Sequence, residues 1–300
     1  MNHDTTAQQL IVPIALSGVD TTHTNIGPET PFFRDMMSLI GHLEPHASQF
    51  LLGTNTQFHL LNKRQREWVY HAMTTKFQDS PGQHIPVIAG ILWSDETIAE
   101  QVRQAQSFGI RRFALGLNHT GDNETRVQKT LAALGPNDTL MLYNMPGFGA
   151  AKMDDVARWV MSDPRIIGFK DPSGKEDIFM RLLLLARSIP GFQLYHGSEA
   201  GWRKLTPEQR KQSAGLISWT ANVRPALLRK FMADPVSVTG EYDALVAQLS
   251  RVVPPFNTHI PGGAIQSYVY NMLKVLLQER VFLSPSSATM YSEPGVKFSL

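Results

Sequence analysis

Short apolar runs alternate with segments of helical periodicity along almost the whole chain. Runs bounded by polar residues, glycine or proline are typical of buried strands, and apolar positions spaced three and four apart are typical of helices that pack on a core. This pattern predicts strands at residues 10–16, 48–52, 85–91, 112–117, 139–144, 166–170, 193–196 and 216–218. It predicts helices at residues 30–43, 62–76, 94–108, 123–134, 153–161, 177–189, 207–213, 225–233, 241–252 and 264–278.

The order of these elements favours a closed parallel barrel. Eight strand–helix units in about 235 residues match a (β/α)8 TIM barrel. The competing architecture is an open doubly wound sheet, but no Gly-x-Gly-x-x-Gly follows the first strand. We expect residues 1–235 to form the barrel as the catalytic domain and residues 236–300 to form a C-terminal helical extension. The last stretch, residues 284–300, contains two prolines and no periodicity, so we expect an irregular tail there.

Two helix starts carry capping signals. Asn62 precedes one helical segment, and Ser94 precedes another that has Asp95 and Glu96 in its first turn. Asn and Ser side chains accept hydrogen bonds from the first amides of a helix, and acidic residues are favoured at the positive end of the helix dipole. We therefore expect these two helices to be capped by Asn62 and Ser94.

Composition excludes several kinds of function. The chain has 42% hydrophobic and 18% charged residues and a net charge of +2, which is ordinary for a globular protein. It contains no cysteine, so disulfides, thiolate catalysis and cysteine-ligated metals are excluded. No dense Lys/Arg block indicates nucleic-acid binding, no apolar run approaches the ~18 residues of a membrane span, and residues 1–9 do not resemble a signal peptide. We therefore expect a cytoplasmic enzyme without nucleic-acid or membrane partners.

The stretch Ile166–Gly174 places a lysine at the end of a predicted buried strand. Lys170 follows an apolar run, and the turn sequence Asp-Pro-Ser-Gly comes directly after it. Parallel barrels carry their active sites at the C-terminal ends of the strands, and Tyr143 lies at the end of the preceding strand. A neutral lysine amine can attack a ketone to form an imine, which is an electron sink, and a phenol can move protons. Burial would lower the lysine pKa and supply the neutral amine.

Other polar residues share the predicted rim of strand ends. They are Thr54, Asn55, Thr56, His119, Asn144, Asp171, His196, Ser198, Glu199, Ser218, Thr220 and Asn222. Each residue at the rim could instead have a purely structural role. Lys170 could pair with Asp171. Tyr143 could be a core aromatic with a backbone partner. Asn222 could cap the helix that begins near Pro225. For each residue alone the alternatives stay open, and only the shared rim favours an active site.

Four motifs, in a consistent order, resemble those of one enzyme family. They are Gly53–Phe58 (GTNTQF), Tyr143–Pro146 (YNMP), Ile166–Asp171 (IIGFKD) and Gly215–Val223 (GLISWTANV). On these motifs, the chain from residue 10 to residue 233 is similar to the dihydrodipicolinate synthase / N-acetylneuraminate lyase family of class I (Schiff-base) aldolases. The resemblance agrees with the barrel predicted from the periodicity.

The resemblance implies roles for particular residues. Lys170 would form the Schiff base with pyruvate or another 2-oxo acid, Tyr143 would shuttle protons, and the Thr54 hydroxyl would join the proton relay. The residues that would bind or border the substrate are Asn55, Thr56, Gly197 and Ile217. The resemblance also implies a homo-oligomer, either a tetramer or a dimer, and a reaction that needs no metal and no organic cofactor.

Departures from the family's motifs lie where a second substrate would bind. Phe148 stands where the synthases carry an arginine, and a phenyl ring cannot clamp a carboxylate. His119 lies in the region of the synthases' second tyrosine, and Glu199 is the one acid left where sialic-acid lyases hold sugar hydroxyls. Asn55 replaces a threonine, although its amide can still donate to a carboxylate. The sequence predicts intact imine chemistry beside a rebuilt pocket, whose candidate lining residues are Phe148, His119, Glu199 and Trp219.

Three functions fit these residues. We expect an aldolase or lyase that makes or cleaves a carbon–carbon bond between a 2-oxo acid and an aldehyde, and Phe148 favours a neutral or partly apolar aldehyde. The first alternative is a 4-hydroxy-tetrahydrodipicolinate synthase with an altered semialdehyde site. The second is a catalytically degenerate barrel that binds a 2-oxo acid without turnover, which the altered loop at residues 54–57 would explain.

Overall fold

The computed structural model describes residues 8–16, 30–53, 58, 61–78, 85–91, 97–117, 121–144, 151–252, 263–282, 290–292 and 296–298. Among these residues, eight parallel strands close into a barrel in sequence order. The strands are β1 (Gln9–Pro13), β2 (Gln49–Leu52), β3 (Val87–Ile91), β4 (Arg112–Leu117), β5 (Thr139–Asn144), β6 (Ile166–Asp171), β7 (Gln193–His196) and β8 (Gly215–Ile217). The barrel closes where Leu10 of β1 lies opposite Leu216 of β8. The predicted (β/α)8 barrel is confirmed.

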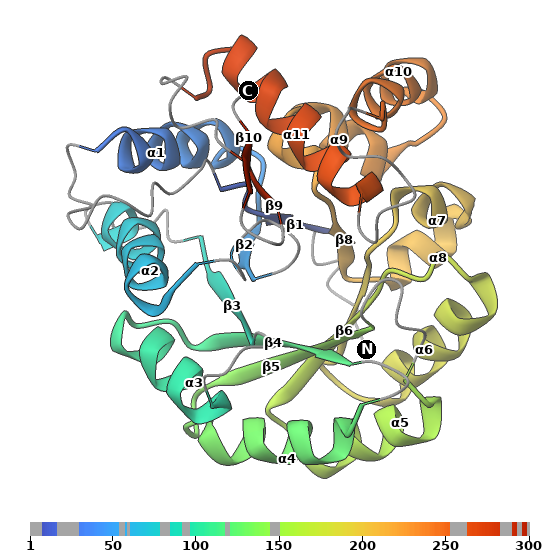
Figure 1. Ribbon diagram of the computed structural model, residues 1–300. Coiled ribbons are helices and arrows are strands. Elements are labelled where there is room, and N and C mark those ends of the chain that lie inside the picture. The colour runs from blue at the N-terminus through green and yellow to red at the C-terminus, as the bar shows by residue number, and fades with distance from the viewer. Residues whose placement is uncertain are drawn as a thin grey trace. The chain divides into compact units, whose positions relative to one another are not determined.

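Helices follow the strands along the chain. They are α1 (Pro31–Leu43), α2 (Lys63–Gln78), α3 (Ile98–Ser107), α4 (Asn123–Ala133), α5 (Met153–Ser162), α6 (Glu176–Ser188), α7 (Glu199–Lys204), α8 (Pro207–Gln212), α9 (Pro225–Ala233), α10 (Thr239–Leu249) and α11 (Gly263–Gln278). Helices α3 to α6 lie along the outside of strands β4 to β6 (Figure 1). The predicted helices at the C-terminus are present as α10 and α11. Among the described helices, none combines the length and the apolar character that crossing a membrane requires.

The chain forms two compact units, each built from separate stretches of sequence. The first comprises Met1–Ile11, Ser48–Leu51 and Pro86–Ser218, and it contains β3 to β8 with helices α3 to α8. The second comprises Val12–Ala47, Leu52–Ile85 and Trp219–Leu300, and it contains α1, α2 and α9 to α11. The division into a barrel at residues 1–235 and an extension at residues 236–300 stays a prediction.

The hydrogen bonds at the first turns of α2 and α3 show that one of the two predicted N-caps is correct. Asn62 accepts a hydrogen bond from the Gln65 amide (3.0 Å) while Gln65 accepts one from the Asn62 amide (2.8 Å), so the predicted cap of α2 is confirmed. The prediction that Ser94 caps the next helix is wrong. Thr97 caps α3 in a capping box with Glu100, and this reciprocal pair satisfies two amides where a single serine would satisfy one.

The structure contains secondary structure at two further places where the sequence predicted none. The short helix α7, capped by Ser198, was not predicted, because six residues are too few to show a helical period. The expectation of an irregular tail at residues 284–300 is wrong in part. Strand β9 (Met290–Ser292) pairs antiparallel with β10 (Val296–Phe298).

Asn222 does not cap a helix. The N-cap of α9 is Arg224, and the buried Asn222 side chain instead bonds to the backbone that follows β1. Its Nδ2 donates to the Pro13 carbonyl (2.7 Å), and its Oδ1 accepts from the Ala15 amide (3.0 Å). The predicted cap is therefore wrong, and the residue's role is to satisfy buried backbone groups.

Alternating side chains fill the barrel and place Lys170 above an apolar core. Residues directly opposite each other on neighbouring parallel strands share a face of the sheet. Tyr143 lies opposite Lys170, and Lys170 lies opposite Tyr195. The two tyrosines belong to a buried cluster whose other members are Ile11, Leu51, Ile88, Ala114, Met141 and Ile217. Lys170 therefore emerges on the inner face of the barrel, at the C-terminal end of β6.

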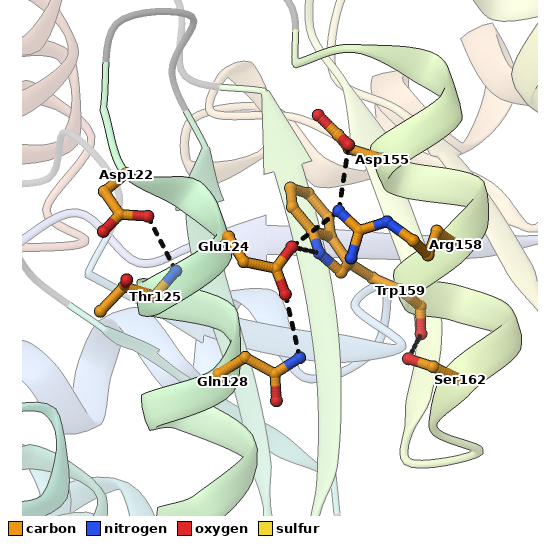
Figure 2. Close-up of polar contacts among 8 residues, drawn as sticks. All are labelled: Asp122, Glu124, Thr125, Gln128, Asp155, Arg158, Trp159 and Ser162. Carbon is orange, nitrogen blue, oxygen red and sulfur yellow. Dashed lines mark hydrogen bonds and ion pairs between the residues drawn. The ribbon is translucent and has the colours of Figure 1, made fainter.

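Helices α4 and α5 are held together by a polar contact on their outer surface. Figure 2 shows Glu124 of α4 accepting hydrogen bonds from Arg158 and from Trp159 Nε1 of α5, each at 2.7 Å. The Arg158 bond, with help from Trp159, lowers the pKa of Glu124 to about 2. Both partners of the ion pair are about half exposed, so the contact fixes geometry more than it adds stability.

Candidate active site

Lys170 is a buried lysine without a carboxylate partner among the described residues. The residue is 6% exposed, and burial lowers its pKa to about 8. No hydrogen bond or ion pair joins its amine to another described residue, and Asp171 is bonded to other groups. The alternative of a Lys170–Asp171 pair is therefore not supported. A desolvated amine with a lowered pKa is the form that attacks carbonyl carbon.

Tyr143 lies beside this amine as a protonated phenol. The Lys170 Nζ is 5.4 Å from the centroid of the Tyr143 ring. Burial raises the pKa of Tyr143 to about 12, which keeps its proton in place near neutral pH. The pair thus combines an amine that readily loses its proton with a neighbouring phenol that carries one, and such groups can exchange protons with a bound molecule.

Arg126 on α4 is a charged residue near this pair that the sequence did not indicate. It is half-buried, with its Nε and Nη2 atoms inaccessible to solvent. Its positive charge acts on Tyr143 and lowers the pKa of the phenol, against the larger effect of burial. A helix residue of this kind carries no motif, so only the fold shows that its charge reaches the strand ends.

Gly197 forms a wall beside Lys170 that leaves no room for a side chain. A Cβ at this position would lie 2.7 Å from Lys170 Cε and 3.0 Å from Pro172 Cα. The Gly197 amide donates to the Asp171 carbonyl at 2.8 Å and so continues the pairing of β6 with β7. Gly197 therefore borders the lysine, and its expected place beside the substrate stays a prediction.

Asp171 and Asn144 hold the turns around the lysine. The fully buried Asp171 carboxylate accepts bonds from the Ser173 amide (3.1 Å) and hydroxyl (2.8 Å) and a long one from Asn144 Nδ2 (3.4 Å). Burial raises the pKa of Asp171, and these bonds oppose that rise. Asn144 Oδ1 accepts from the Ala151 amide at 3.0 Å, which ties together the two ends of the connection from β5 to α5.

Glu199 and Ser218 meet at the ends of β7 and β8. The Ser218 hydroxyl, which is buried, donates to Glu199 Oε1 of the half-buried glutamate. Glu199 is the first residue of α7, where the helix dipole favours an acid, and Ser198 caps that helix by accepting from the Gly201 amide at 3.1 Å. Ile217, the last residue of β8, packs in the apolar cluster with Tyr143. The structure therefore offers one carboxylate and one hydroxyl at this part of the rim.

His196, which the sequence places at the rim, points away from it. Its ring stacks on Phe179 of α6 with centroids 4.5 Å apart, and its Nδ1 accepts a bond from the Ser198 amide at 3.1 Å. Burial lowers the pKa of His196 to about 4, so the ring is neutral. His196 lies opposite Asp171 in register, on the face of the sheet that does not carry Lys170. It is a packing residue between sheet and helix.

Several predicted site residues lie outside the described residues, and their roles stay predictions. They are Thr54, Asn55, Thr56, His119 and Phe148. In the described part of the chain, no group of three or more His, Asp or Glu side chains is arranged to hold a metal ion.

Comparisons with known proteins identify the fold. No protein-family model matches the chain, and a search of curated proteins finds no match. Among solved structures, a dihydrodipicolinate synthase from Bacteroides thetaiotaomicron is similar over 99% of this chain and 95% of its own, with 20% identity and a TM-score of 0.73. CdNal from Clostridium difficile in complex with mannosamine is similar over 97% and 94%, with 14% identity and a TM-score of 0.69. An N-acetylneuraminate lyase from Fusobacterium nucleatum complexed with pyruvate is similar over 91% and 87%, with 12% identity and a TM-score of 0.63. The chain therefore has the fold of the dihydrodipicolinate synthases and N-acetylneuraminate lyases.

Proposed function

We propose that this chain is a Schiff-base aldolase or lyase of the dihydrodipicolinate synthase / N-acetylneuraminate lyase family, acting on pyruvate or another 2-oxo acid. The observation that carries the proposal is the buried amine of Lys170, with its pKa lowered to about 8, beside the protonated phenol of Tyr143. The fold shared with lyases of this family supports the same chemistry. The similar lyase from Fusobacterium nucleatum, crystallised with pyruvate, supports pyruvate as the 2-oxo acid.

The proposed reaction begins with the neutral amine. With a pKa of about 8, roughly one Lys170 in eleven is neutral at pH 7, against about one in 3,000 for a lysine with the ordinary value. The amine attacks the ketone carbon of the 2-oxo acid, and loss of water gives a protonated imine. Release of a proton from the neighbouring carbon gives an enamine, which attacks the aldehyde carbon and forms the new bond. Water then hydrolyses the imine and restores the lysine; cleavage is the same sequence reversed.

Tyr143 supplies and recovers protons in this sequence. A phenol with a pKa near 12 donates a proton only transiently and regains it readily, so it suits the departure of water from the carbinolamine and protonation of the aldehyde oxygen. The Thr54 hydroxyl, as the family resemblance implies, relays these protons, and the loop at Thr54 and Asn55 binds the carboxylate of the 2-oxo acid.

The aldehyde partner is proposed to be neutral and to carry hydroxyl groups. The Glu199 carboxylate bonded to Ser218 can accept a hydrogen bond from a substrate hydroxyl. Phe148, where the synthases have an arginine, disfavours a carboxylated semialdehyde. Mannosamine, the ligand of the similar CdNal, is likewise rich in hydroxyl groups.

The reaction is tested by incubating the protein with pyruvate and a panel of aldehydes, and with the corresponding aldol products, while pyruvate is measured by chromatography. Pyruvate is expected to be consumed or released with hydroxylated neutral aldehydes, and Lys170→Ala is expected to abolish the change. The exposed Lys175 provides the matched control, because Lys175→Ala removes a nearby amine that the proposal does not use. Turnover confined to aspartate semialdehyde would favour the synthase instead.

The remaining expectations from the resemblance are proposals of the same kind. Turnover is proposed to need no metal and no organic cofactor, which activity after dialysis against EDTA tests. The chain is proposed to form a homo-oligomer, a dimer or tetramer, which light scattering tests. The absence of cysteine suits a reducing compartment such as the cytoplasm.

A further inference from the structure

A small cavity lies inside the amino-terminal end of the barrel, at the opposite end from the candidate active site. Its lining includes Arg112 and Gln193, the first residues of β4 and β7, and, further along the strands, Met141, Gly168 and Tyr195. We call it the floor cavity. It opens to solvent, and its volume of about 20 Å³ exceeds the ~10–15 Å³ that one water molecule needs. Water can therefore enter the barrel from the end that substrate does not use.

Gly168 brings this cavity close to the amine of Lys170. The two residues are two positions apart on β6, so they share the inner face and their Cα atoms lie about 7 Å apart. Gly168 lines the floor cavity and contributes no side chain to the space below the lysine. Another residue has to fill that space, because Lys170 is only 6% exposed.

The ring of Tyr195 fills the space beside Gly168. Tyr195 lies opposite Lys170 on the neighbouring strand and is 2% exposed. A Cβ built on Gly168 would lie 3.7 Å from Tyr195 Cε2, which is ordinary van der Waals contact, and 2.9 Å from the Gln193 carbonyl oxygen. The ring thus crosses from β7 to β6 and packs where a side chain of Gly168 would be. Because Tyr195 also lines the floor cavity, its side chain is part of the partition between that cavity and the lysine.

Hydrogen bonds hold the Tyr195 ring in this position. Its hydroxyl lies 2.6 Å from Gln193 Oε1 and 2.7 Å from Gln9 Oε1, and these glutamines are the first residues of β7 and β1. Gln9 Oε1 also accepts a bond from Gln49 Nε2, and Arg112 Nη1 donates to Gln49 Oε1 at 3.0 Å. The network fixes the hydroxyl at the amino-terminal end of the barrel, so the aromatic ring stays between that end and the lysine.

We propose that Tyr195 is a positioning residue for Lys170, whose ring is a plug that keeps water in the floor cavity away from the amine. This role rests on the proposed function, because imine formation needs a neutral amine and a dry site favours the neutral form. Water below the lysine would stabilise the charged form. Removal of the ring is therefore expected to raise the pKa of Lys170 from about 8 toward the ordinary value of 10.5.

The test is competitive acetylation of Lys170 in the native protein with a trace of acetic anhydride between pH 6 and pH 10.5, measured by mass spectrometry against an added lysine standard. In Tyr195→Ala, and in Tyr195→Val, which suits a strand better, the midpoint of the Lys170 titration is expected to rise by roughly one pH unit or more. Tyr195→Phe keeps the ring and is expected to titrate as the wild type does. Tyr242→Ala is the matched control, because Tyr242 is also buried but stacks on Phe231 of α9.

A wild-type midpoint in Tyr195→Ala and Tyr195→Val would overturn the proposal, and if only Tyr195→Val folds, its titration decides. An equal shift in Tyr195→Phe would overturn it by assigning the effect to the hydroxyl, and an equal shift in Tyr242→Ala by assigning it to a general loss of stability. The assay needs no turnover, so the two proposals fail separately. Shifted variants of a wild type that forms no borohydride-trapped imine with pyruvate would refute the proposed function alone. A trapped imine with unshifted variants would refute the plug alone.

Discussion

Burial is expected to make the Lys170 amine reactive at a pH where an ordinary lysine is almost fully protonated. The structure lowers its pKa from 10.5 to about 8, through desolvation alone. Between pH 8 and pH 10 the neutral fraction of such an amine rises only about twofold, from one half to nearly all. A lysine with the ordinary pKa gains about 75-fold over the same interval. The shape of the pH profile therefore separates the two cases.

The assay is competitive labelling of the native protein with a trace of acetic anhydride between pH 6 and pH 10.5. The acetylation of Lys170 is quantified by mass spectrometry of its peptide and divided by that of added Nα-acetyl-lysine amide. The ratio corrects for the pH dependence of the reagent and is expected to fall steeply above pH 8. A ratio that is constant with pH would show that Lys170 titrates as an ordinary amine, and the argument from burial would be refuted.

Three other changes test the same site. Gly197→Ala places a Cβ 2.7 Å from Lys170 Cε and is expected to lower turnover at least ~10-fold by displacing the amine. Gly240→Ala is the neutral control, because the new Cβ has no atom within 4 Å. Tyr143→Phe keeps the ring and is expected to lower kcat by about 10²–10⁴ while an imine still forms; an unchanged kcat would contradict its role. Lys170→Met is expected to be more stable than the wild type at pH 7, as measured by urea unfolding, and this stability difference is expected to be roughly 3 kcal/mol smaller at pH 10.5. The wild type gains stability as the pH rises because the unfolded lysine binds more protons than the folded one between pH 8 and pH 10.5. An equal difference at both pH values would count against a lowered pKa.

The barrel was accessible from the sequence because its strands are short apolar runs with clear boundaries. The predicted bounds of β4, β5 and β7 agree with the structure residue for residue. Lys170 and Tyr143 were predicted to lie at adjacent strand ends, and the register places them directly opposite each other. Periodicity carries this information because a parallel sheet buries both faces and leaves little choice of where a strand stops.

The orientation of side chains at the rim was harder to predict. His196 and Lys170 both stand at strand ends, but the alternation of side chains turns His196 toward Phe179 and Lys170 into the barrel. The phase of that alternation is set by register, and β5 and β6 shift register between Leu140 and Met141. A shift of one residue exchanges the two faces, so no count along the sequence fixes which residue points inward.

Contacts between residues that lie far apart in the sequence could not be predicted from the sequence. Arg126 acts on Tyr143 from a helix, and Arg112 meets Gln49 across 63 positions of sequence. Neither arginine lies in a motif, because each acts through a charge placed by the fold. The capping box of α3, by contrast, has a signature in the sequence itself, because Glu100 follows Thr97 by three residues.

The central claim, that Lys170 forms an imine with a 2-oxo acid, is tested most directly by reductive trapping. The protein is incubated with pyruvate and sodium borohydride, digested, and mapped by mass spectrometry, with Lys170→Ala as the control. The account predicts a reduced pyruvate adduct on the Lys170 peptide of the wild type and none on the variant. An unlabelled wild-type protein that still binds pyruvate by calorimetry would contradict the account and favour a barrel that binds the 2-oxo acid without turnover. Labelling that persists in Lys170→Ala would contradict it as well.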